Sequence, residues 1–113
     1  KAFLNLCKNH PPDICILGLG PDGHITSLFP LLQDSAFSEE NVVIHTTTDI
    51  LAVHDRISLT LPALTQAKKF LFLLKGEEKK KTWEAMLESP EDARRWPAKW
   101  VIERGDVTVV SWW

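Results

Sequence analysis

The sequence has 113 residues, of which 44% are hydrophobic and 25% are charged, as in an ordinary globular domain, and this length permits one domain at most. The net charge of −2 is too close to neutral to favour a nucleic-acid partner, and no apolar run approaches the roughly 20 residues that span a membrane. Cys7 and Cys15 fit no zinc-binding spacing and are expected to be reduced thiols, which predicts a cytoplasmic protein.

Apolar runs and turn residues divide the chain into alternating strands and helices. In chain order they predict the end of a helix at 1–8, a strand buried on both faces at 14–17, a β-branched strand at 42–48, an alternating segment at 57–61, a helix near 63–69, a buried strand at 70–74, a helix from about 77 to 88 and a last strand at 107–110. Strands that alternate with helices imply parallel pairing. The expected fold class is therefore α/β, with a layered, mostly parallel sheet flanked by helices.

A glycine-rich turn follows the first predicted strand directly. Gly18, Gly20 and Gly23 match the G-x-G-x-x-G pattern of dinucleotide-binding proteins. That pattern requires a long helix after the third glycine, because the N-terminus of this helix holds the pyrophosphate. Here Pro30 comes too early for such a helix, and Pro21 removes one N–H group from the loop. Nucleotide binding is therefore the weaker interpretation of the turn.

His24, at the end of this turn, is the leading candidate for chemistry. Ligands of open α/β sheets gather at the carboxyl ends of the strands, and an imidazole can take a proton near neutral pH. Gly23 permits a positive φ and close access for a substrate, and Asp22 is placed to orient the ring or to cap the turn. The alternative is a turn aspartate beside a solvated histidine, and the residues alone leave both interpretations open.

Arg56 and Lys79 form a second group of candidates, for holding an anion. Lys79 falls in the first turn of a predicted helix, where a cation is unfavourable unless a bound anion shares its charge with the free N–H groups. The alternative is a solvated run of charges at 77–81. The other histidines are expected in loops and the tryptophans in the core or an interface; these residues are His10, His45 and His54, and Trp83, Trp96, Trp100, Trp112 and Trp113.

Several blocks of the sequence, taken in order, resemble the 6-phosphogluconolactonase family. They are residues 18–24, 27–30, 56–62, 72–79 and 96–98. The related glucosamine-6-phosphate deaminases and isomerases share the Gly-x-Asp-Gly-His core but usually continue with Asn-Glu-Pro, where this chain has Ser-Leu-Phe-Pro at 27–30. The resemblance therefore favours the lactonase, and it implies a Rossmann-like fold of the sugar-phosphate isomerase/lactonase type.

The resemblance also implies a reaction and roles for residues. The reaction is hydrolysis of 6-phospho-D-glucono-1,5-lactone to 6-phosphogluconate in the oxidative pentose phosphate pathway, with no metal or organic cofactor. His24 would be the general base for water, with Asp22 as its neighbour, and Arg56 and Lys79 would hold the 6-phosphate. The glycines at 18, 20 and 23 would form the loop backbone. The alternatives are a deaminase or isomerase of sugar phosphates and a non-catalytic fragment that binds them.

Two blocks of the family pattern are not found in this chain. They are an early Gly-Gly phosphate loop followed by Thr-Pro, and an Asp-Glu-Arg segment before the glycine-rich turn. Residues 1–113 are therefore expected to be the C-terminal portion of a larger lactonase domain, with an uncovered sheet edge that invites association. The alanine that the family carries after its lysine is Lys80 here, which leaves Lys79 and Lys80 both open as the phosphate ligand.

Overall fold

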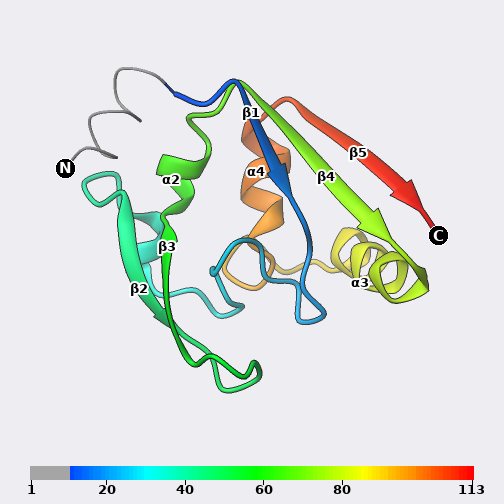
Figure 1. Cartoon of the computed structure of the whole chain (residues 1–113), viewed down its shortest axis with the longest axis horizontal. Coiled ribbons are helices and arrows are strands. Elements are labelled where there is room, and N and C mark those ends of the chain that lie inside the picture. The colour runs from blue at the N-terminus through cyan, green and yellow to red at the C-terminus, as the bar shows by residue number, and fades with distance from the viewer. Residues whose placement is uncertain (1–10) are drawn as a thin grey trace.

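The computed structural model describes residues 11–113, and Figure 1 shows how their helices and strands are arranged. The elements are β1 (Ile14–Leu17), a 3-10 helix η1 (Asp34–Phe37), β2 (Val43–Thr47), β3 (Asp55–Leu59), α2 (Leu61–Leu64), β4 (Lys69–Lys75), α3 (Glu77–Glu88), α4 (Ala98–Arg104) and β5 (Val107–Trp112). The predicted helix end at 1–8 lies outside the described residues, as do Cys7 and His10. No helix in the described part of the chain is long and apolar enough to cross a membrane.

A three-stranded parallel sheet forms one side of the molecule, which confirms the predicted α/β class. Its strand order is β1-β4-β5, and β4 pairs in parallel with both neighbours. The chain returns from β4 to β5 through α3 and α4, as parallel pairing requires a long crossover. Parallel strands end at the same edge of the sheet, so the loops that leave β1 and β4 are neighbours in space (Figure 1).

One face of this sheet carries the hydrophobic core. Phe70, Phe72 and Leu74 alternate along β4 and are fully buried. The ring of Trp83 lies 5.3 Å from the ring of Phe72, which places α3 against this face. Val101 of α4 belongs to the same buried cluster. Helix α3 spans the residues predicted for it, whereas α4 and η1 are short elements that the sequence pattern does not predict.

The opposite face of the sheet corrects the prediction that β1 is buried on both faces. Ile14 and Ile16 are 59% and 62% exposed, and Leu73 and Val110, which pair with each other, are also exposed. The strand forms at the predicted apolar run, but none of the described residues covers its second face. A short apolar run shows that both faces of a strand are apolar, and it does not show that this chain covers both.

The β2–β3 hairpin corrects the expectation that neighbouring strands pair in parallel. β2 and β3 form a separate antiparallel sheet, joined by the short connection 48–54, which leaves no room for a crossover helix. After β3, Thr60 caps helix α2 and Pro62 occupies its first turn as predicted, although α2 ends earlier than expected. In Figure 1 the hairpin lies at one side of the molecule and the parallel sheet at the other.

Candidate active site

The loop after β1 is a tight turn that presents His24. The Gly23 N–H donates to the Gly20 carbonyl at 2.9 Å, and the Gly20 N–H donates to the His24 carbonyl at 2.8 Å. Gly23 has a φ of +92°, the positive value that its residue type permits. Between this turn and η1 the chain forms no helix. The glycine pattern therefore lacks the helix N-terminus on which a dinucleotide pyrophosphate would rest.

Asp22 holds His24 in both of the ways that the sequence allows. Its Oδ1 accepts a hydrogen bond of 3.1 Å from the His24 N–H and lies 2.5 Å from His24 Nδ1. The side chains of His24 and Asp22 are only 16% and 13% exposed. Because a carboxylate can only accept, this contact assigns the proton of the neutral imidazole to Nδ1. His24 Nε2 is then the nitrogen with a free lone pair.

The imidazole of His24 packs against the backbone of Gly20 and against the ring of Phe29. A Cβ on Gly20 would lie 2.1 Å from two atoms of the ring, so only glycine fits there. The ring of Phe29 lies 5.0 Å from the imidazole. A Cβ on Gly18 would meet nothing within 4 Å. The three predicted loop glycines thus differ: Gly20 makes room for the imidazole, Gly23 adopts a positive φ, and Gly18 borders open space.

Lys79 reaches this loop from the first turn of α3. Its Nζ donates a hydrogen bond to the main-chain carbonyl of Leu19. An open cavity of about 360 Å³ lies beside it, lined by Gly18, Leu19, Gly20, His24, Thr26 and Lys79. Lys80 is not among the lining residues. The structure therefore brings Lys79 and His24 to one cavity. This is expected, because His24 follows β1, Lys79 follows β4, and these two parallel strands end at the same edge of the sheet.

Arg56 stands next to this cavity rather than in its wall. Its guanidinium carbon lies 5.8 Å from the centre of the Phe29 ring, which is the ring that also contacts His24. Its Nε donates to the Val53 carbonyl at 3.2 Å. Arg56 and His24 thus both lie against the ring of Phe29.

Thr26 and Ser58 belong to the site and are missed by sequence reasoning. Thr26 has a φ of +51°, which is rare for a β-branched residue and costs about 1–3 kcal/mol. Its hydroxyl lies 2.9 Å from that of Ser58 on β3, which ties the loop to the hairpin. Ser58 and Arg56 are two positions apart and so share one face of β3. No pattern in the sequence signals the unusual backbone at Thr26.

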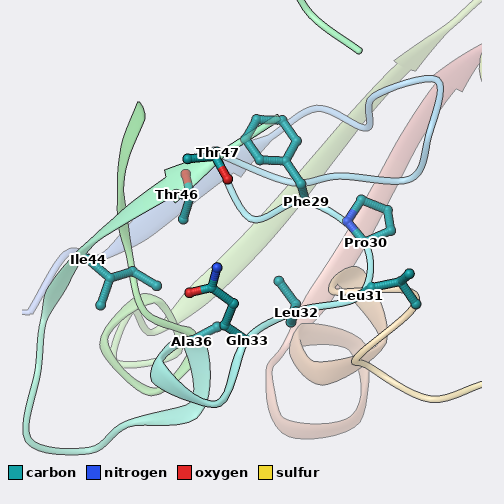
Figure 2. Close-up of a pocket in the computed structure, with 9 residues that line it drawn as sticks. All are labelled: Phe29, Pro30, Leu31, Leu32, Gln33, Ala36, Ile44, Thr46 and Thr47. Atoms are coloured by element: carbon teal, nitrogen blue, oxygen red, sulfur yellow. The ribbon is translucent and has the colours of Figure 1, made fainter. Parts of the chain in front are cut away.

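Two other parts of the structure lack the chemistry of this site. A cavity of about 60 Å³ between segment 29–36 and β2 is lined by Phe29, Pro30, Leu31, Leu32, Gln33, Ala36, Ile44, Thr46 and Thr47, none of them ionisable (Figure 2). Among residues 11–113 there is also no group of His, Cys, Asp and Glu side chains that could hold a metal ion. The Gly18–His24 loop, with an imidazole and an ammonium group at one cavity, is therefore favoured over both as the candidate site.

Comparison with protein families gives this geometry a context. The model of the family of glucosamine-6-phosphate isomerases and 6-phosphogluconolactonases matches residues 1–112. The chain belongs to this family. A probable 6-phosphogluconolactonase of Dictyostelium discoideum is 41% identical over 102 residues, covering 90% of this chain and 43% of that protein. A 6-phosphogluconolactonase of Neisseria meningitidis is 31% identical over 99 residues, which cover 85% of this chain and 42% of that protein.

Solved structures of the family agree with the fold. A 6-phosphogluconolactonase from Shewanella baltica superposes with a TM-score of 0.81 at 29% identity, covering 97% of this chain and 48% of that one. A monomeric glucosamine-6-phosphate deaminase has a TM-score of 0.76 at 20% identity, a likeness of fold alone. The resemblance to the lactonase family is thereby confirmed. This chain spans less than half the length of these relatives.

Proposed function

We propose that this chain takes part in the hydrolysis of 6-phospho-D-glucono-1,5-lactone to 6-phosphogluconate, in the oxidative pentose phosphate pathway. The observation that carries the proposal is the part-buried Asp22–His24 pair, whose free Nε2 belongs to a ring that lines an open cavity. The relatives with 31% identity or more described above are named as lactonases, which supports this substrate over an aminosugar phosphate.

The proposed chemistry uses His24 as a general base. His24 Nε2 takes a proton from a water molecule while the water oxygen adds to the C1 carbonyl carbon of the lactone. The bond between C1 and the ring oxygen then breaks, and the imidazolium returns its proton to that oxygen. The carboxylate of Asp22 keeps Nδ1 protonated and stabilises the positive ring. A base placed in this way contributes about 10²–10⁴-fold to the rate.

The substrate phosphate would be held by the cations around the same cavity. Lys79 Nζ now donates to a main-chain carbonyl, and a phosphate oxygen is a stronger acceptor for the same group. Helix α3 begins after Gly76, and its first N–H groups have no partner within the helix, which suits an anion there. Arg56 would reach the phosphate from the hairpin. Binding this remote group fixes the carbonyl against the attacking water.

The proposal extends to the setting in which the chain acts. The exposed apolar face of β1-β4-β5 is of the kind that parallel sheets normally bury, and the relatives are about twice as long as the match. We infer that residues 1–113 work as the C-terminal portion of a lactonase domain, and that this face associates with the remainder. A cytoplasmic location is part of the same proposal and rests on the free thiol of Cys15.

A rate measurement with matched histidine variants tests the proposed function. The polypeptide that carries these residues is given freshly prepared lactone, and its hydrolysis is compared with the spontaneous reaction. His24→Ala is expected to bring the rate close to the spontaneous one. His45→Ala is the control, because His45 also contacts an aspartate but is exposed. An undiminished rate in His24→Ala would remove His24 from the mechanism, and ammonia release from glucosamine 6-phosphate would assign the deaminase instead.

A further inference from the structure

A segment far along the chain holds the turn that carries the base. Arg95 Nη1 donates a hydrogen bond of 2.9 Å to the main-chain carbonyl of Asp22, 73 positions away. Asp22 Oδ1 accepts from His24, whereas Oδ2 is buried and accepts no hydrogen bond from the described residues. Because the carboxylate is held through one oxygen, the main-chain position of Asp22 decides where that oxygen meets the imidazole.

The indole of Trp96 completes this support. A Cβ on Gly23 would lie 2.7 Å from the indole, so the glycine backbone rests directly on the ring. The guanidinium carbon of Arg95 lies 3.8 Å from the centre of the same ring, a stacked cation–π contact. Arg95 Nε also lies 3.8 Å from a carboxylate oxygen of Glu91. The guanidinium is therefore oriented by an aromatic face and an acid before it reaches Asp22.

We propose that Arg95 is a positioning residue for His24. Together with Trp96 it fixes the turn at Asp22 and Gly23, so that the imidazole keeps Nδ1 on the carboxylate and Nε2 free. Arg95 is not among the residues that line the cavity in front of the imidazole, and it lines a separate open cavity of about 570 Å³ together with Asp22 and Phe29. Its hydrogen bond reaches the main chain of Asp22 and not the ring, so its effect on His24 passes through Asp22. The kinetic consequence rests on the proposed function, whereas the effect on the ring is a property of the structure.

The neighbouring arginine provides a matched control. Arg94 Nη1 donates 2.7 Å to the carbonyl of Leu32, and its guanidinium carbon lies 4.9 Å from the centre of the Phe37 ring. Arg94 Nη2 pairs with Asp34 at 3.0 Å. Arg94 thus makes the same kinds of contact as Arg95, to a different loop. Loss of Arg94 therefore removes one hydrogen bond to a main-chain carbonyl and one cation–π contact, as loss of Arg95 does, but at Leu32 and Phe37 instead of at Asp22 and Trp96.

The test compares Arg95→Met, Arg95→Lys and Arg94→Met. The first readout is the ¹H–¹⁵N correlation spectrum of the His24 imidazole at pH 8, which distinguishes a ring protonated on Nδ1 from one protonated on Nε2. Wild type and Arg94→Met are expected to show the Nδ1–H form alone. Arg95→Met is expected to show both forms in exchange. Arg95→Lys keeps a donor and is expected to restore part of the Nδ1–H signal, which a loss of folding would not do.

The second readout is the lactonase reaction. Arg95→Met is expected to lower kcat on the order of 10- to 100-fold with little change in KM, because the base is misplaced and the phosphate site is intact. If Arg95→Met keeps the wild-type spectrum, the positioning role is wrong whether or not the chain is a lactonase. If the spectrum changes as expected and the wild-type chain hydrolyses no lactone, the positioning role stands and the proposed function fails.

Discussion

Residues 11–113 contain two histidine–aspartate pairs of the same composition in different surroundings. His24 and Asp22 lie 2.5 Å apart, with side chains 16% and 13% exposed. His45 and Asp55, on the β2–β3 hairpin, lie 3.1 Å apart, with side chains 61% and 81% exposed. In water such a pair is worth little, because solvent screens it and two side chains must be ordered. Burial gives the first pair a fixed geometry that the second lacks.

The difference comes from what surrounds each pair rather than from the pair itself. The imidazole of His24 rests on Gly20 and Phe29, and the turn below it rests on Trp96. His45 is on an exposed position of β2. We infer that a histidine and an aspartate can act as an acid–base pair when the surrounding residues restrict the imidazole to a single orientation. Five substitutions, arranged in three experiments, test this difference.

The largest contrast is expected between Asp22→Asn and Asp55→Asn. The amide at position 22 can donate to Nδ1, which favours the wrong form of the ring, so kcat is expected to fall by about 10²–10⁴-fold. Asp55→Asn is expected to leave kcat unchanged and to shift the free energy of unfolding by less than about 0.5 kcal/mol. Steady-state kinetics and urea unfolding provide the two measurements. Equal kinetic effects in the two variants would mean that burial does not distinguish the pairs.

A smaller but sharper effect is expected from Gly20→Ala. The added methyl group would lie 2.1 Å from the His24 ring, so the ring must leave its place, and kcat is expected to fall on the order of 100-fold. Gly18→Ala is the comparison: a Cβ there meets nothing within 4 Å, so the ring keeps its place, and because Gly18 lines the cavity an effect is expected on KM rather than on kcat. Steady-state kinetics of both variants decide the matter. Wild-type kcat in Gly20→Ala would show that the glycine contact does not place the imidazole.

Arg56→Ala is expected to have the smallest effect and to act on KM rather than on kcat. Arg56 contacts the ring of Phe29 and is not among the residues that line the cavity beside His24, so we expect it to hold the phosphate without touching the base. Loss of one charged hydrogen bond to the phosphate is expected to raise KM by about 10-fold. The measurement is the KM of the lactone in the variant and in wild type. A fall in kcat at constant KM would place Arg56 at the reacting carbonyl instead.

The sequence predicts the parallel sheet and α3 well because their signals are local. Phe70 to Leu74 form a dense apolar run, and Glu77 to Glu88 combine an acidic start with helical spacing of apolar residues. The hairpin and the open sheet face are predicted less well. The partner of a strand, and the presence of a cover on its second face, depend on segments distant in sequence, which an apolar run does not reveal.

In the candidate site, too, the contacts between residues close in sequence are predicted and those between distant residues are not. The Asp22–His24 contact spans two positions, and turn chemistry predicts it. The contacts of Arg95 with Asp22 and of Ser58 with Thr26 join segments 73 and 32 positions apart, and no local pattern signals them. Sequence reasoning thus finds the group that would react, and the structure adds the groups that hold it in place.

The central claim, that His24 takes the proton from water, is tested most directly by a His24→Gly variant with added imidazole. The space left by the ring lies between Gly20 and Phe29 and is open to the cavity. Without imidazole, kcat is expected to fall by about 10²–10⁴-fold. With imidazole, hydrolysis is expected to rise in a saturable way above the reaction of imidazole with the lactone alone. A His24→Gly variant that hydrolyses the lactone as fast as wild type, with no imidazole present, would contradict the account.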